Sequence, residues 1–171
     1  MAATIPTFAF MRVKLSRWIA LGFGSGLAPV MPGTVGTLCA WVLFLILDQA
    51  VQSLATASVS KDLIWLGILT TGLWLGSWAC DRTGRDLGVA DHGAMVWDEF
   101  IAFWLVLWVL DASTMSFSSQ FWAFIAFRFF DMVKPPPIRY FDQRLKSGFG
   151  VMFDDLLAAF YTLLLIAWFN S

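Results

Sequence analysis

The residues of this chain that are best suited to chemistry are acids beside long apolar runs. Asp98 and Glu99 open one run, Asp131 lies near the end of another, and Asp154 and Asp155 begin the last. A single acid at a helix start caps free N–H groups and complements the helix dipole, which is a purely structural role. Two adjacent acids at a membrane boundary cost more than one cap requires: a charge costs about 2.5–3.5 kcal/mol at the bilayer centre and less near the interface. We therefore predict that these five acids form one site.

Basic residues accompany the acids at a spacing of three. Arg128, Asp131 and Lys134 fall on one face of a helix, and the prolines at 135–137 predict that this helix ends near Lys134. The structural alternative is a salt-bridged stripe followed by a proline stop. Converging acids with nearby bases suit metal-assisted phosphoryl chemistry, and Mg²⁺ typically binds one or two carboxylates together with phosphate oxygens. The pattern therefore favours Mg²⁺ as a cofactor.

Two glycine-containing segments offer backbone groups to an anion. Residues 148–153, with Gly148 and Gly150, predict a glycine-rich turn before Asp154. A capped helix is the alternative there. Residues 22–37 are also rich in glycine and include Gly33 and Thr34. Such small residues indicate either close helix packing or a loop that offers donors to a headgroup.

The composition defines the class of protein that must hold these residues. Of 171 residues, only 13% are charged and 59% are hydrophobic, and the mean hydropathy is +0.73. Soluble domains carry about 25% charge. The formal net charge of −1 gives no basic field for nucleic acid. The composition therefore excludes a disordered chain and a nucleic-acid binder, and it favours an integral membrane protein.

Hydropathy predicts an all-α, multi-pass bundle. We expect about five spans, at 36–50, 62–80, 99–110, 119–133 and 154–169, and a broken or re-entrant segment at 18–30. If the spans alternate, nine of the 11 bases fall on one side of the membrane. The positive-inside rule makes that side cytoplasmic. We therefore expect one membrane domain over 1–171, with residues 1–17 as a cytoplasmic segment and the acidic site facing the cytoplasm.

Four blocks in this order resemble the phosphatidylglycerophosphatase A family over residues 18–160. The first two blocks are GFGSGLAP with PGTVGT, at 22–29 and 32–37, and DHG with VWDEF, at 91–93 and 96–100. The third joins Arg128, DMVKPPPIR at 131–139 and Asp142, and the fourth is GFGVMFDD at 148–155. Each block is weak alone, and the four in order are specific. Ser147 and Ala159 depart from glycines that are common in the family, which affects the expected packing more than the chemistry.

The resemblance implies Mg²⁺-dependent hydrolysis of phosphatidylglycerophosphate to phosphatidylglycerol and phosphate in the bacterial inner membrane. It implies that Asp98, Glu99, Asp131, Asp154 and Asp155 match the family's acidic motif positions. These acids would hold Mg²⁺ and position a water or act as base. Three bases are expected to clamp the phosphate: Lys134, Arg128 and Arg139. Asp91 and His92, the only histidine, are expected to assist proton transfer. Four further residues are expected to line the substrate: Gly33, Thr34, Gly148 and Gly150.

Several alternatives stay open from the sequence. Intramembrane acids also line ion paths, so a small ion- or proton-coupled transporter is a rival function. A non-catalytic subunit whose acids only cap helices is another. If the chain is a lipid phosphatase, the sequence shows no pocket that selects one phosphomonoester lipid over another. It also leaves open the oligomeric state, the number of metal ions, and whether water or an aspartate attacks phosphorus.

Overall fold

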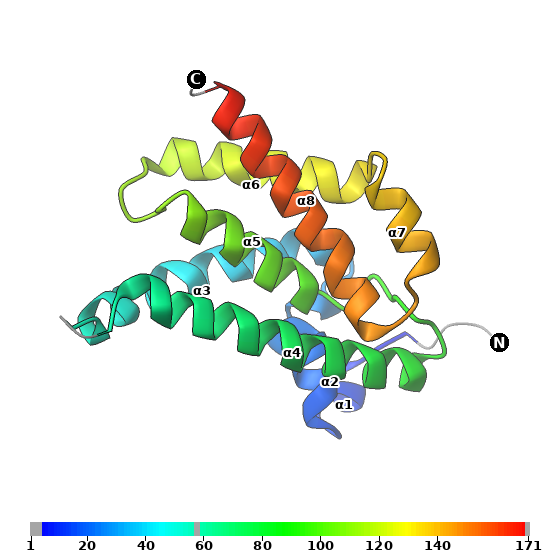
Figure 1. Cartoon of the computed structure of the whole chain (residues 1–171). Helices are drawn as coiled ribbons and strands as arrows, with labels where there is room; N and C mark the ends of the chain where they lie inside the picture. The colour runs from blue at the N-terminus through cyan, green and yellow to red at the C-terminus, as the bar shows by residue number, and fades with distance from the viewer. Residues whose placement is uncertain (1–4, 57–58, 170–171) are drawn as a thin grey trace.

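The computed structural model describes residues 5–56 and 59–169, and the described residues form helices and no strand (Figure 1). Residues 1–4 of the predicted N-terminal segment lie outside this description. The all-helical membrane bundle predicted from the sequence is confirmed. Its long helices are α3 (Pro32–Leu54), α4 (Lys61–Leu87), α5 (Trp97–Val109), α6 (Phe117–Val133) and α8 (Gly148–Phe169). Three short helices accompany them: α1 (Phe8–Met11), α2 (Leu15–Ala20) and α7 (Ile138–Arg144).

Three of the five predicted spans are long and apolar enough to cross a bilayer. They are α3, α4 and α8, with 23, 27 and 22 residues. The other two, α5 and α6, have only 13 and 17 residues, which is about 20 and 26 Å of helix. Because α5 packs against α3, α4, α6 and α8 and is buried from Trp97 to Trp104, protein rather than lipid surrounds most of it. A helix enclosed in this way need not match the bilayer thickness.

Tryptophan side chains fix α5 to its neighbours. The Nε1 of Trp104 donates to the carbonyl of Ala40 on α3 (2.8 Å), and the Nε1 of Trp97 donates to the carbonyl of Gly72 on α4 (3.0 Å). A Cβ at Gly76 would lie 2.4 Å from the Trp97 ring, so this glycine lets the ring reach the α4 backbone. These contacts set the depth and rotation of α5, which carries Glu99.

The segment predicted to be broken, 18–30, is broken. Helix α2 ends at Ala20, and a 3₁₀ segment, Gly22–Leu27, follows. Positive φ angles at Gly22, Phe23 and Gly24 turn the chain before α3 begins at Pro32. Proline in the first helical position has a preset φ and lacks only an N–H that would be unpaired there.

The two ends of the bundle carry different charges. Residues 12–17, the last turns of α4 and residues 134–146 hold nine of the 11 bases. We call this end of the bundle, which also holds Arg128, the basic end. At the opposite end, Asp48 accepts hydrogen bonds from Trp65 and Gln52 (both 2.8 Å), and Lys61 bridges Asp48 and Asp111 (3.2 and 3.0 Å). This polar cluster ties α3 to α4 and to the turn after α5.

The predicted glycine-rich turn at 148–153 is wrong, because α8 is helical from Gly148 onward. A Cβ at Gly148 would lie 1.9 Å from the carbonyl oxygen of Ser77 on α4, and one at Gly150 would lie 2.0 Å from that of Leu145. These glycines let α8 approach α4 and the preceding loop closely. The sequence suggested a turn because the α4 backbone that packs against Gly148 lies about 70 residues earlier in the chain, so this contact leaves no local signal.

This close approach predicts a difference between two glycines. Gly148→Ala should lower the free energy of unfolding by about 1–3 kcal/mol, because its methyl group forces backbone apart. Gly67→Ala is the control: nothing lies within 4 Å of its Cβ position in α4, and alanine favours a helix. Thermal unfolding in detergent measures both. Equal midpoints for the two variants would contradict the packing role of Gly148.

Candidate active site

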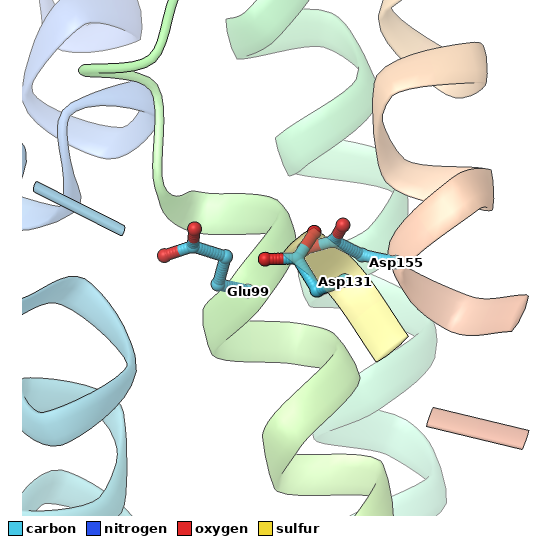
Figure 2. Close-up of side chains that lie close together, drawn as sticks. All are labelled: Glu99, Asp131 and Asp155. Atoms are coloured by element: carbon cyan, nitrogen blue, oxygen red, sulfur yellow. The ribbon is translucent and has the colours of Figure 1, made fainter. Parts of the chain in front are cut away.

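Three carboxylates from three helices meet at the basic end (Figure 2). They belong to Glu99 on α5, Asp131 on α6 and Asp155 on α8, and one oxygen of each lies within 4.8 Å of the others. All three are buried, with at most 9% of their surface exposed. Within the described part of the chain this is the group of acids close enough together to hold a metal ion. Helices far apart in sequence thus build the site.

The start of α5 is held by the broken N-terminal segment. The amide of Val96 donates to the carbonyl of Ala20 (2.8 Å). A Cβ at Gly22 or Gly36 would lie 2.6 or 2.7 Å from the Val96 side chain. Val96 is therefore held between the two glycines, and it fixes where Glu99 enters the site one turn later.

Arg128 binds two of the three acids. Its Nη1 donates to Glu99 Oε1 (2.8 Å), lies 2.6 Å from Asp131 Oδ2, and donates to Thr37 Oγ1 at 3.3 Å. Gly33 lies directly beside this pair, because a Cβ there would be 2.1 Å from Glu99 Oε1. The predicted residues Gly33 and Arg128 are therefore at the site. In this structure the guanidinium of Arg128 is engaged by the carboxylates.

Thr37 and Gly36 also contact the site, and the sequence analysis did not assign them a role there. Thr37 donates to the carbonyl of Gly33 (2.9 Å), and a Cβ at Gly36 would lie 2.9 Å from Glu99 Oε2. The sequence did hold a signal for them. Pro32 marks a helix start, and from that start positions 33, 36 and 37 share one helical face.

Lys134 joins α6 to α7 and α8. It ends α6 in the left-handed conformation (φ 45°), as the prolines predicted, and its Nζ binds Asp154 and, at 3.0 Å, Asp142. Partial burial by itself would raise the pKa of Asp142, but the hydrogen bond and charge of Lys134 outweigh it and lower that pKa below its usual value. Asp142 on α7 is therefore ionised near neutral pH and helps to position Lys134.

The remaining two predicted acids lie next to the group of three. Asp98 is buried, and its Oδ1 accepts the backbone amide of Glu99 (3.0 Å). Asp154 is buried and paired with Lys134. All five acids expected to converge are therefore at the same end of the bundle, with Glu99, Asp131 and Asp155 closest together.

The charges of this site are not balanced by protein. Its five buried carboxylates pair with only two positively charged side chains, those of Arg128 and Lys134. Asp154 Oδ1 and Asp155 Oδ2 are buried without a hydrogen-bond partner among the described residues. A buried carboxylate oxygen without a donor is unstable unless it is protonated or binds a cation. The donor set therefore fits a divalent cation, which prefers carboxylate oxygens.

Among the described residues, no hydrogen bond or ion pair joins the other predicted residues to the three acids. His92 uses Nδ1 to accept the amide of Ala94 (3.1 Å) inside the loop before α5. Asp91, exposed in the same loop, interacts electrostatically with Asp131 and Lys134. Arg139 is exposed on α7, and Thr34 is half-buried in the first turn of α3. Their predicted roles in proton transfer and phosphate binding stay predictions, as do those of Gly148 and Gly150.

The apolar helices and the buried acidic centre define an integral membrane protein with a candidate metal site. Comparison of the sequence with protein families is more specific: residues 18–170 match the family described as Phosphatidylglycerophosphatase A. The chain belongs to this family, which makes it a phosphatase.

Curated relatives agree with the family assignment. A phosphatidylglycerophosphatase A from Haemophilus influenzae is 44% identical over 86% of this chain and 84% of its own length. One from Escherichia coli is 39% identical over 86% of this chain and 80% of its own. A Bacteroides thetaiotaomicron protein provisionally named a phosphatidylinositol-3-phosphatase is 34% identical over 87% of this chain and 89% of its own. No solved structure matches the chain.

The pairing of Lys134 predicts a loss of stability in its absence. Lys134→Met should lower the free energy of unfolding by about 2–4 kcal/mol, because it leaves Asp154 buried and unpaired. Lys146→Met, at an exposed base in the loop before α8, is the matched control and should change stability little. Chemical unfolding in micelles compares them. A Lys134 variant as stable as the control would show that Asp154 does not depend on this cation.

Proposed function

We propose that this protein hydrolyses phosphatidylglycerophosphate to phosphatidylglycerol and phosphate. The observation that carries the proposal is the meeting of Glu99, Asp131 and Asp155 from three helices, in a chain of the phosphatidylglycerophosphatase A family. Its curated relatives from two bacteria bear the same name. The comparisons offer no support for the rival function of a transporter.

The proposal includes Mg²⁺ as cofactor. Glu99, Asp131 and Asp155 would hold it, with Asp98 and Asp154 beside them, because their buried oxygens fit a hard cation. The ion would polarise the phosphoryl oxygens and lower the pKa of a bound water. The unpartnered oxygens of Asp154 and Asp155 support this part of the proposal.

The chain's own residues bind the substrate and move protons in this proposal. Lys134, Arg128 and Arg139 neutralise the phosphate, and a carboxylate of the acidic group takes a proton from the attacking water. The new bond joins the water oxygen to phosphorus, and the bond from phosphorus to the glycerol oxygen breaks. The leaving oxygen needs a proton, and Asp91 and His92 lie in the loop from which one could be delivered.

We infer that the site faces the cytoplasm of a bacterium, in the inner membrane. The support is the basic end, where nine of the 11 bases lie together with the acidic site. Basic residues accumulate on the cytoplasmic side of membrane proteins. A lipid substrate fits the apolar exterior of the helices that are long enough to cross a membrane.

Asp155→Asn tests the acidic group. Phosphate release should fall by about 10²–10³-fold, because a ligand and a charge are lost where transition-state charge develops. The midpoint of thermal unfolding should not fall, since the variant removes a buried carboxylate with an unpartnered oxygen. Asp62→Asn, at an exposed acid of the opposite end, is the control with normal activity. Near-normal turnover by folded Asp155→Asn would overturn the site assignment.

A panel of lipid phosphomonoesters tests the substrate and the metal together. We expect purified protein to release phosphate fastest from phosphatidylglycerophosphate, to lose activity in EDTA, and to recover it with Mg²⁺. Phosphatidylinositol 3-phosphate belongs in the panel because one relative is provisionally named for it. A faster rate on that lipid would reject the proposed substrate and keep the enzyme class. Full activity in EDTA would reject the metal.

A further inference from the structure

A hollow at the basic end lies apart from the acidic centre. It has a volume of about 460 Å³ and opens between α2 and the last turns of α4. None of its lining residues belongs to the acidic site. The principal side chains of its wall are Lys14, Leu15, Trp78, Arg82, Arg85 and Asp86.

The wall of this hollow is divided into an apolar and a basic part. On α4, Trp78, Arg82 and Arg85 follow one another at spacings of four and three, so they share one helical face. Trp78 lies on the side of the apolar span and is 42% exposed. On the other wall, Leu15 is 69% exposed next to Lys14. The α4 side and the α2 side of the hollow therefore each place an apolar side chain next to a cationic one.

The positive charge of the hollow is incompletely neutralised. Asp86 is shared by two bases, Lys14 at 2.8 Å and Arg17 at 3.0 Å. Arg85 pairs with Asp81. Arg82 is exposed and makes no ion pair or hydrogen bond with any residue in 5–56 or 59–169. One carboxylate for two cations, and an unpaired guanidinium beside it, leave room for an anion.

We propose that this hollow binds the phosphate of an anionic phospholipid headgroup. Basic pockets between helices on the cytoplasmic side bind such headgroups, and guanidinium groups donate geometrically matched hydrogen bonds to phosphate. Tryptophan favours the boundary between headgroups and acyl chains. A zwitterionic lipid would place its own cation against Lys14 and Arg82, so charge complementarity selects a net anionic lipid. The bound lipid would contact both α2 and α4.

The same phosphate chemistry has two sources, a lipid headgroup or free phosphate, and the experiment separates them. Full-length protein in uncharged detergent is titrated with phosphatidylglycerol, with phosphatidylcholine of the same chains, and with inorganic phosphate. Bound lipid is counted by native mass spectrometry, and the thermal unfolding midpoint is followed. We expect binding and stabilisation by phosphatidylglycerol alone, because a ligand that binds only the folded state stabilises it.

Arg82→Gln should weaken phosphatidylglycerol binding by about tenfold, and Arg82→Lys by less, because the charge is kept without the planar donors. Arg12→Gln is the matched control: it removes the same charge from an exposed base of the basic end that does not line the hollow. Phosphatidylglycerol bound at the acidic centre is unaffected by Arg82, so the difference between variants reports the hollow. All three variants should keep normal turnover in uncharged micelles, which separates this test from that of the proposed function.

Two results would overturn the proposal. Equal weakening by Arg12→Gln and Arg82→Gln would show a general attraction of the basic end for anionic micelles. Stabilisation by inorganic phosphate that depends on Arg82 as strongly as that by phosphatidylglycerol would assign the hollow to free phosphate instead of a lipid.

Discussion

The mutual repulsion of five buried carboxylates is the constraint around which this protein is built. Like charges a few ångströms apart in a site of low dielectric repel strongly, and each also loses its hydration. Two cations, Arg128 and Lys134, offset part of this cost. Each cation bridges two elements, Arg128 between α5 and α6 and Lys134 between α7 and α8. The ion pairs that make the acidic group tolerable are thus also the contacts that join the helices around it.

Holding the acids so close requires helices to approach one another more closely than large side chains allow. Gly33 and Gly36 bring α3 onto Glu99, Gly76 admits Trp97, and Gly148 brings α8 onto α4. Small residues serve this purpose in membranes, where the hydrophobic effect does not drive helices together. The core helix α5 is enclosed by protein and need not match the bilayer thickness. Its first turn can therefore lie inside the bundle, where Glu99 meets acids from α6 and α8.

Sequence reasoning predicted the parts of this design that leave a local signature. Asp131 and Lys134 share a helical spacing, and prolines end α6 where predicted. Acids at span ends were expected to converge because hydropathy fixes which ends meet. The sequence did not predict the helical start of α8. Gly148 is a packing residue because it contacts Ser77 on α4, and a contact so distant in the chain has no local signature. Thr37 was missed for a similar reason: its site partners, Arg128 and Glu99, lie more than 60 residues away.

The two ends of the bundle show which buried acid signals function. Asp48 and Asp155 are almost equally buried, at 4% and 3% exposure. Both oxygens of Asp48 accept hydrogen bonds, from Trp65 and Gln52, and Lys61 adds its charge. Asp155 keeps an oxygen without a described partner. Burial alone thus does not distinguish a structural acid from a reactive one. At one end, a carboxylate whose hydrogen bonds are all made forms a rigid connection between helices. At the other end, a carboxylate oxygen without a donor is able to bind a cation, which in turn favours a phosphate.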